Sequence, residues 1–494
     1  MNASDAAPAS AAPEYPNRWL AMSVLLIANF MNMIDVTIVN VALPSLQSSL
    51  SATESAIEWV VAGYILAFAL GLLPFGRSGD IYGKRRVFLI GVTAFTLASA
   101  LCGFATSIDM LLVSRVIQGV AGAMMTPQIL AIAQVMFPPK ERAAAFALFG
   151  LTAGMASVAG PITGGFLIEH NVFGLEWRPI FLINLPIGIL AVIAGRALIP
   201  DIRGNRDLTN DFVGIVLAAI AIFLLIFPLI EGRGFGWPAW CFAMMALSVP
   251  FAVAFVAWQY RQRNRGGPEL LPVSLMTNYG YMLGAGTVMV FFSAMPGYFL
   301  MLTVFLQSGY GLGPLDAGLT TMPFPVGVLI TSIVTGRMGG RGPRIRIALG
   351  TAILMVSVIV LRFTVSGVGE SIERIAFIIP MFLGGVGLGL AIAPMYQLTL
   401  MKVPGRDAGS GSGALQAIQQ MGAAFGVAII SEIFFATIPK QMAAGATLHD
   451  AFKAGFLSAT WYNMCVYVLI AVAILALKPS AEVSGGRPAM HVGE

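Results

Sequence analysis

The chain is long, apolar and poor in charge. It has 494 residues, of which 57% are hydrophobic and only 10% are Asp, Glu, Lys or Arg, whereas soluble domains carry about 25% charged residues. This composition excludes a set of soluble domains, which need charged surfaces, and a disordered chain, which needs low hydrophobicity and high charge. Cys102, Cys241 and Cys465 lie far apart, so we expect neither a disulfide framework nor a metal cluster.

Fourteen apolar stretches follow one another along the chain. The length of each stretch is close to the roughly 20 residues that a helix needs to cross the hydrocarbon core of a bilayer. We therefore predict an all-α membrane protein with fourteen transmembrane helices. The predicted spans are 18–41, 55–76, 87–106, 109–136, 143–169, 179–199, 212–231, 238–260, 279–304, 316–337, 345–366, 374–398, 408–436 and 456–477. Residues 1–17 do not have the pattern of a cleaved signal, and we expect them to form a disordered cytoplasmic tail.

The basic residues predict the orientation. If the N-terminus is cytoplasmic, 21 of the 28 Lys and Arg residues lie on the cytoplasmic side and 6 on the opposite side, and Arg115 alone lies inside a predicted span. The positive-inside rule therefore predicts a multi-pass protein of the inner (plasma) membrane with both termini cytoplasmic, including a C-terminal tail at 478–494. Because the basic residues are spread over all inner loops, the net charge of +5 needs no nucleic-acid partner.

A weak internal repeat indicates two related halves. The stretch at 76–84, GRSGDIYGK, is echoed at 336–344 by GRMGGRGPR. The first stretch follows the second span, and its echo follows the second span of the set that begins at 279. We therefore predict six-helix halves at 18–199 and 279–477 with two inserted helices at 212–260, and duplicated halves are a common plan among transporters.

Two charged residues lie within predicted spans at matching depth. Asp35 and Arg115 are each about six residues, or roughly 9 Å, from the outer ends of the first and fourth spans. An ionisable side chain in a membrane is a candidate functional residue, and Gln118 lies on the same helical face as Arg115. We expect a pair that responds to protonation of Asp35. A static ion pair, or an Asp35 that only binds a neighbouring polar group, is the alternative.

The fifth span carries small residues and a proline. Gly160, Gly164 and Gly165 would let another helix approach closely, and Pro161 should kink the helix. These residues indicate a hinge or a tight seal between the halves, with simple close packing as the alternative.

Four further residues are weaker candidates. Trp59, Tyr64 and Gln397 are candidates for lining a substrate cavity, and Glu432 is a candidate second acid, although lipid or helix contact would explain the same positions. The three histidines fall in loops or in the tail, and no nucleophile–base pair or nucleotide motif occurs. We therefore expect neither an enzyme nor a cofactor.

Several motifs match a known family. The first span contains DVTIVNVALP at 35–44, and the next inner loop contains Gly76, Asp80, Gly83, Lys84 and Arg85. Arg115, Gln118 and Gly119 follow in the fourth span, and GPITGG lies at 160–165 in the fifth. Over about 18–478, the chain resembles the fourteen-helix drug:proton antiporters of the major facilitator superfamily, the EmrB/QacA type.

The resemblance implies roles for these residues. Asp35 would handle protons or a cationic substrate, and Arg115 would assist proton transfer. The inner-loop residues Gly76, Asp80, Gly83, Lys84 and Arg85 would form a latch that holds the outward-facing state. The loop departs from the family pattern at Arg77 and Ile81, and the second copy has Gly340 in place of the acid, so any latch there should be weaker.

The function implied by the resemblance is proton-coupled multidrug efflux of hydrophobic or cationic compounds by alternating access. The alternative is proton-coupled export of a specific native metabolite, such as a siderophore, a lipid or an amino acid. The expected partners are a small-molecule substrate, protons, the lipid bilayer and a periplasmic adaptor protein, whose contact we expect at the outer loop 437–455.

Overall fold

The computed structural model describes residues 15–338 and 342–476 of the chain. Within these ranges, fourteen helices are long and apolar enough to cross a membrane, which confirms the predicted number of spans and the all-α class. Residues 1–14 of the expected N-terminal tail, the expected tail at 478–494 and residues 339–341 of the repeated loop lie outside the described residues.

We group the first six spans, the last of which is broken, as the N-terminal half, the next two as the inserted helices and the last six as the C-terminal half. The helices of the N-terminal half are α1 (Arg18–Leu50), α2 (Glu54–Tyr82), α3 (Lys84–Gly103), α4 (Ile108–Met136), α5 (Pro139–Glu169), α6 (Pro179–Leu182) and α7 (Asn184–Leu198). Within this half, α4 packs between α2 and α3, and α1 packs on α5 and α7. The boundary between the third and fourth spans is set by Ser107, whose Oγ accepts a hydrogen bond from the Met110 backbone N at 3.2 Å and begins α4.

The inserted helices and the C-terminal half follow. The inserted pair is α8 (Phe212–Glu231) and α9 (Ala239–Asn264), and a short α10 (Val273–Met276) leads into the second half. That half contains α11 (Tyr279–Val304), α12 (Pro314–Thr321), α13 (Pro323–Met338), α14 (Pro343–Gly367), α15 (Ile378–Leu400), α16 (Ala408–Ala443) and α17 (Leu448–Ala476). In it, α15 packs on α13 and α14, and α16 packs on α11 and α17.

Several predicted boundaries differ from the structure, and three of these differences bear on the predictions made above. Helix α1 continues to Leu50, so Asp35 lies roughly 22 Å from its end rather than 9 Å. The tenth span is divided at Met322, because Pro323 has no backbone N–H to continue the helix. The predicted outer loop 437–455 is wrong: α16 and α17 extend through it and leave only residues 444–447 outside helices. The expected adaptor contact therefore cannot be a long loop.

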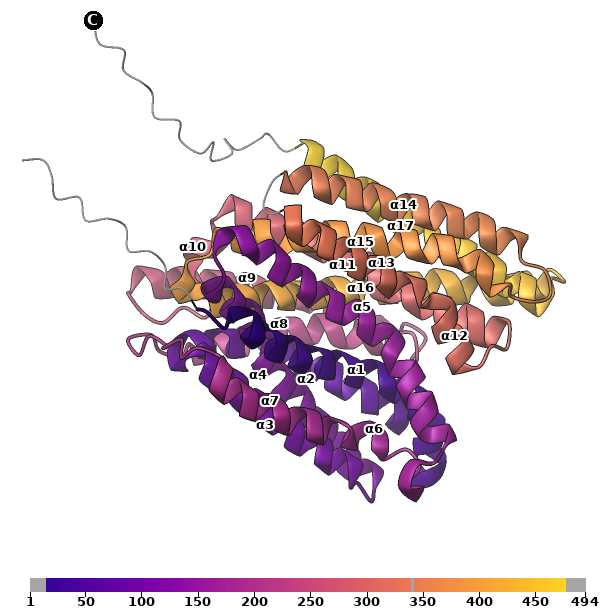
Figure 1. The fold of residues 1–494 in the computed structure, drawn as a ribbon, viewed down its shortest axis with the longest axis horizontal. Coiled ribbons are helices and arrows are strands. Elements are labelled where there is room, and N and C mark those ends of the chain that lie inside the picture. Colours follow the sequence, from indigo (N-terminus) through magenta and orange to yellow (C-terminus); the bar gives the residue numbers. More distant parts are fainter. Residues whose placement is uncertain (1–14, 339–341, 477–494) are drawn as a thin grey trace, which may run out of the picture.

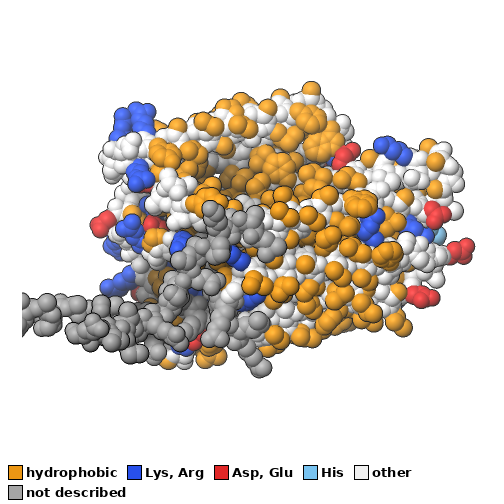
Figure 2. Space-filling view, turned by 90° about the horizontal axis from the view of Figure 1, so that it is seen from above, with side chains coloured by type: hydrophobic (Ala, Val, Ile, Leu, Met, Phe, Trp, Pro, Cys, Tyr) orange, Lys and Arg blue, Asp and Glu red, His pale blue; other side chains and the backbone are white. Residues whose placement is uncertain are grey.

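The two halves approach each other most closely at one end of the molecule, and α5 also contacts α12 towards the other end. Figure 1 shows them lying side by side, close together at the left and diverging towards the right. Contacts between the halves are made by α2 and α4 with α16, and by α5 with α12, α13 and α15. Figure 2 shows Lys and Arg side chains gathered mainly at the same left end. We call this end, which carries Arg77, Lys84, Arg85, Lys402 and Arg406, the Lys/Arg-rich end.

The inserted helix α8 contacts both halves. A small apolar cluster contains Leu66 and Ala69 of α2 together with Ile222 and Ile226 of α8, and Met421 of α16 packs against it. Helix α8 therefore packs against both α2 and α16 along this part of their length.

Candidate functional site

Asp35 lies at the centre of a buried polar cluster. Its side chain and that of Arg115 both have 0% exposure, and Arg115 Nη1 lies 2.5 Å from Asp35 Oδ2. The other carboxylate oxygen, Oδ1, accepts hydrogen bonds from Gln118 Nε2 at 2.8 Å and from Asn184 Nδ2 at 3.0 Å. The carboxylate is thus held by three donors, two from α4 and one from α7.

Arg115 also binds groups on α2. Its Nε donates to the Val60 carbonyl at 2.9 Å, and its guanidinium lies 4.2 Å from the centre of the Tyr64 ring, a distance at which cation–π attraction operates. The Tyr64 hydroxyl donates to Asn32 Oδ1 at 2.7 Å. The cluster therefore joins α1, α2, α4 and α7, and we call it the Asp35 cluster.

The partners of the Asp35 cluster all come from the N-terminal half. Ser99 of α3 accepts hydrogen bonds from Gln118 at 2.8 Å and from Asn184 at 3.3 Å, which extends the cluster to a fifth helix. Because Asp35 is fully buried among these helices, a bound compound between the halves cannot touch its carboxylate in this conformation. Removing one partner from such a buried ion pair typically costs 3–5 kcal/mol, since the other charge is left uncompensated.

The glycines of the fifth span hold α5 against α1. A Cβ at Gly160 would overlap the Thr37 side chain, and a Cβ at Gly164 would lie 2.9 Å from Ile38 Cγ1. Thr37 Oγ1 also donates to the Ala156 carbonyl at 2.9 Å. The small residues of α5 therefore contact the helical turn that follows Asp35. Helix α5 continues through Pro161 and bends towards its far end in Figure 1.

Asp80 joins the two halves at the Lys/Arg-rich end. Its carboxylate accepts hydrogen bonds from the backbone N of Gly409 at 2.8 Å and of Ser410 at 2.7 Å, and from Ser410 Oγ at 2.8 Å. Lys84 Nζ lies 2.9 Å from the same carboxylate. A carboxylate is favourable at the N-terminus of a helix such as α16, where unpaired N–H groups carry partial positive charge. We call these four residues the Asp80 latch.

The other residues of the inner-loop motif, Gly76, Gly83 and Arg85, do not bind the Asp80 carboxylate and have separate structural roles. Gly76 lets α2 approach α16 so closely that a Cβ would overlap the Gly409 carbonyl. Gly83 ends α2 with a φ of 99°, which favours glycine. Arg85 donates to the Arg196 carbonyl at 2.5 Å within the N-terminal half, so it does not bind Asp80.

Sequence reasoning missed several residues of this contact. Arg77, one of the departures from the family pattern, lies 3.6 Å from Asp407 of the other half. Gln134 of α4 donates to the carbonyls of Leu400 and Val403, each at 2.8 Å. Arg77 follows a predicted span and looks solvated in the sequence, and Gln134 is a neutral amide inside the fourth predicted span, so no clear signal marked either residue.

An aromatic cluster lies where α5 of the N-terminal half meets α11 and α15 of the C-terminal half. Tyr396 of α15 packs edge-on against Phe149 of α5, with ring centres 5.8 Å apart, and against Phe292 of α11 at 6.5 Å. The Tyr396 hydroxyl donates to Gln419 Oε1 of α16 at 2.6 Å. Side chains from both halves therefore form one largely buried aromatic contact, which we call the aromatic cluster.

The three candidates for cavity lining are not brought together. Trp59 packs at a tilt against Phe227 of the inserted helix α8, with ring centres 5.9 Å apart. Tyr64 belongs to the Asp35 cluster, where it is almost fully buried. Gln397 lies half-buried on α15, and its Oε1 has no hydrogen-bond partner among the described residues.

Glu432 lies apart from the Asp35 cluster, near the loop between the inserted helices. It is exposed and accepts a hydrogen bond from Trp237 Nε1 at 2.9 Å. The guanidinium of Arg233 in the same loop lies 3.4 Å from the centre of the Phe435 ring. Burial lowers the pKa of Arg233, and the nearby Glu432 carboxylate acts in the opposite direction. Among residues 15–338 and 342–476, no group of three or more His, Cys, Asp or Glu side chains is placed to hold a metal ion.

Comparison with known proteins identifies the family. The sequence matches the Major Facilitator Superfamily over residues 25–427. It is 39% identical over 437 residues to the "Probable actinorhodin transporter" of Streptomyces coelicolor, covering 88% of this chain and 76% of the relative. It is 31% identical over 465 residues to the "Multidrug resistance protein Stp" of Mycobacterium tuberculosis, covering 94% and 82%.

The fold agrees with this assignment. It is similar to the structure of the human organic anion transporter MFSD10, with a TM-score of 0.62 at 15% sequence identity, covering 92% of this chain and 99% of that chain. The chain therefore belongs to the Major Facilitator Superfamily, and it is a multi-pass membrane transporter rather than an enzyme.

Proposed function

We propose that this protein is a proton-coupled exporter that moves hydrophobic or cationic compounds across the inner (plasma) membrane by alternating access. The observation that carries the proposal is the fully buried Asp35–Arg115 pair, because a paired carboxylate at this depth can change the state of the protein by taking up a proton. The relatives named for actinorhodin transport and multidrug resistance support the class of substrate. The Lys/Arg-rich end, with both termini, faces the cytoplasm.

Protonation of Asp35 is the first step of the proposed transport cycle. A neutral carboxyl ends the ion pair and leaves the buried Arg115 charge uncompensated, which costs several kcal/mol in this setting. The N-terminal half must then rearrange until the guanidinium finds other partners or water. A proton that crosses a membrane potential of 100 mV supplies about 2.3 kcal/mol per charge, in addition to any pH gradient.

The contacts of the Asp35 cluster carry this change to the other half. Arg115 binds α2 through the Val60 carbonyl, and α2 ends in the Asp80 latch. The turn after Asp35 packs against Gly160 of α5. Helices α2 and α5 both contact the C-terminal half, so a shift at Asp35 acts on two of the helices that join the halves.

The substrate contacts other residues. Since Asp35 lies inside the N-terminal half, a cationic substrate does not compete for it by direct contact in this conformation. The aromatic cluster of Phe149, Phe292 and Tyr396 lies between the halves instead, and its buried rings would become accessible to substrate when the halves separate. Aromatic rings of this kind bind flat apolar compounds by stacking and cations over their faces.

The test measures proton-driven efflux in vesicles that contain the full chain or its Asp35→Asn variant. The matched control is Asp211→Asn, since Asp211 is also buried and accepts hydrogen bonds from Gln259 Nε2 at 2.7 Å and Trp258 Nε1 at 2.9 Å. We expect Asp35→Asn to lose proton-driven efflux and Asp211→Asn to keep it. Undiminished coupling in Asp35→Asn at normal protein levels would remove Asp35 from the mechanism.

Export of one native metabolite is the second candidate function. It is favoured by the relative named for a single compound, actinorhodin. A resistance screen in an efflux-deficient host, with and without a proton uncoupler, tests for multidrug export. Metabolite profiles of a deletion strain test for a native substrate such as a siderophore, a lipid or an amino acid. Resistance to several unrelated compounds that the uncoupler abolishes would favour multidrug export.

A further inference from the structure

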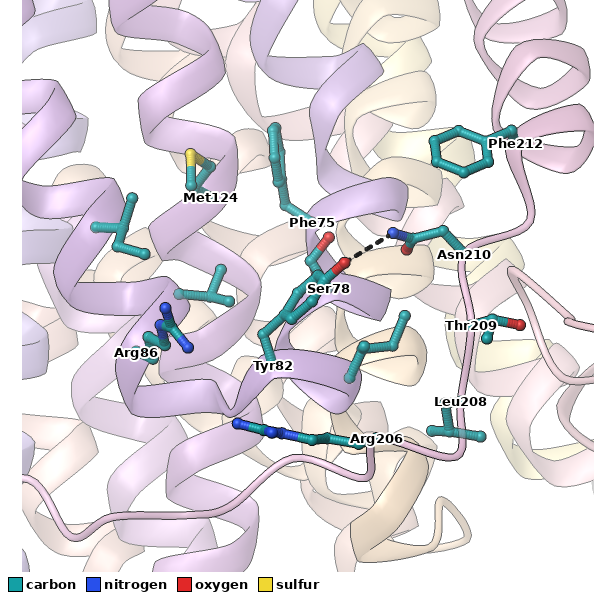
Figure 3. A pocket seen from close by; sticks show the side chains of 13 residues that line it. Phe75, Ser78, Tyr82, Arg86, Met124, Arg206, Leu208, Thr209, Asn210 and Phe212 are labelled. Carbon is teal, nitrogen blue, oxygen red and sulfur yellow. Dashed lines mark hydrogen bonds between the residues drawn. The ribbon is translucent and has the colours of Figure 1, made fainter.

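A large cavity lies outside the machinery described above. Its volume is about 850 Å³, and it is bounded by α2, α3 and α4 and by the segment at 206–212 that leads into α8. Members of the Asp35 cluster and the aromatic cluster do not line it. Figure 3 shows the cavity with Arg86 and Arg206 towards its lower end.

The cavity has a charged end and an apolar end. In Figure 3, the guanidinium groups of Arg86 and Arg206 lie below, whereas Phe75, Met124 and Phe212 lie above. Within the described part of the chain, neither guanidinium has an ion pair or a hydrogen bond to a protein group. Two unpaired cations at the end of an apolar surface complement an amphiphile with an anionic head.

The wall formed by the segment before α8 is fixed in place. The Asn205 backbone N donates to the Asp80 carbonyl at 2.8 Å, and Asn210 Nδ2 lies 3.2 Å from the Tyr82 hydroxyl. A Cβ at Gly204 would overlap the Ile81 carbonyl, so the segment lies directly on the end of α2. The cavity is therefore part of the fold and does not require the segment to move.

We propose that this cavity binds an anionic phospholipid of the cytoplasmic leaflet, with its phosphate between Arg86 and Arg206 and its acyl chains along Phe75, Met124 and Phe212. Exposed Phe212 and Arg86 open the site to the surrounding membrane. Anionic lipids are enriched in that leaflet, and basic pockets between transmembrane helices bind their head groups. The proposal requires the Lys/Arg-rich end to be cytoplasmic and is independent of the transported compound.

The experiment titrates the purified full-length protein with phosphatidylglycerol or phosphatidylcholine and counts bound lipids by native mass spectrometry. The test variant is Arg86→Gln/Arg206→Gln. The matched control is Arg263→Gln/Arg265→Gln, which removes the same charge from exposed residues at the end of α9, outside the cavity. The readout is lipid binding, so it is separate from the transport assay.

We expect one phosphatidylglycerol to bind in preference to phosphatidylcholine. Each basic residue near an anionic lipid contributes roughly a fivefold gain in affinity, so the loss of both arginines should weaken binding by about 25-fold. The control variant should bind as the unmodified protein does. An equal loss in the control, or no loss in Arg86→Gln/Arg206→Gln, would overturn the proposal.

Two competition arms identify the occupant. Inorganic phosphate should not displace phosphatidylglycerol, because it lacks the acyl chains that contact the apolar end. Displacement by phosphate would assign the cavity to a free anion and contradict a lipid site. Displacement of one lipid by one molecule of a transported compound would assign the cavity to substrate entry and also contradict it.

Discussion

Replacing Asp80 with asparagine should shift the protein towards opening at the Lys/Arg-rich end. The Asp80 carboxylate accepts three hydrogen bonds from Gly409 and Ser410 across the halves and pairs with Lys84 at 2.9 Å. Hydrogen bonds to a charged group contribute about 1.5–3 kcal/mol each, against 0.5–1.5 kcal/mol for neutral ones. In asparagine, an NH₂ group takes the place of one carboxylate oxygen and cannot accept a hydrogen bond, so at least one of these contacts is lost.

The expected loss is therefore about 3 kcal/mol, which changes the ratio of closed to open molecules by roughly 150-fold. The amide also leaves Lys84, which is only 4% exposed, without its carboxylate. The hydrogen bonds from Gly409 and Ser410 join the halves, so their loss destabilises the closed arrangement. The Asp80–Lys84 pair lies within the N-terminal half, so its loss acts on that half.

Spin–spin distances would measure this shift. Labels at Ala197→Cys on α7 and Met401→Cys after α15 are exposed at the Lys/Arg-rich end of opposite halves, and Cys465→Ser removes the exposed native thiol. We expect Asp80→Asn to add a population with a longer distance. The control Asp201→Asn removes an exposed carboxylate at the same end and should leave the distances unchanged. Unchanged distances in Asp80→Asn would refute the reasoning.

Three further substitutions test the contacts around the Asp35 cluster and the latch. Gly160→Leu should abolish transport, because its side chain would overlap a threonine of α1; efflux and membrane insertion are measured together. Arg115→Lys should fail to restore the efflux lost in Arg115→Ala, since an ammonium cannot reach both Asp35 and the α2 carbonyl in the geometry of a guanidinium. Arg77→Leu should change spin–spin distances less than Asp80→Asn, because its contact with Asp407 is long, at 3.6 Å.

The fold was largely predictable because a membrane restricts the chain. Spanning helices must be long and apolar, so their number and order followed from the sequence. The ends of α16 and α17 were not predictable by this reasoning, because helices that extend beyond the apolar region carry polar residues and look like loops. The break before Pro323 had a signal in the proline itself, but apolar residues on both sides hid it.

The Asp35–Arg115 contact was predictable for a similar reason. Two opposite charges in long apolar spans have few other charged groups with which to pair. Their similar distances from the ends of the predicted spans also suggested a common depth in the membrane. Asn184 and Ser99 could not be found in this way, because neutral polar residues are common in spans and carry no charge that demands a partner. Their role is visible only in the structure, where α7 packs against both α1 and α3.

The packing of α2 and α16 explains why the inserted helices must take part in any movement of the halves. Near the Asp80 latch the two helices touch through glycines, and a Cβ at Gly413 would lie 2.6 Å from the Leu72 carbonyl. Further along, α8 packs against both helices, with Ile222 and Ile226 in the same cluster as Leu66 of α2 and with Met421 of α16 against that cluster. If α2 and α16 separate at the latch, α8 can stay packed on only one of them. The inserted pair therefore has to move with one half and slide against the other.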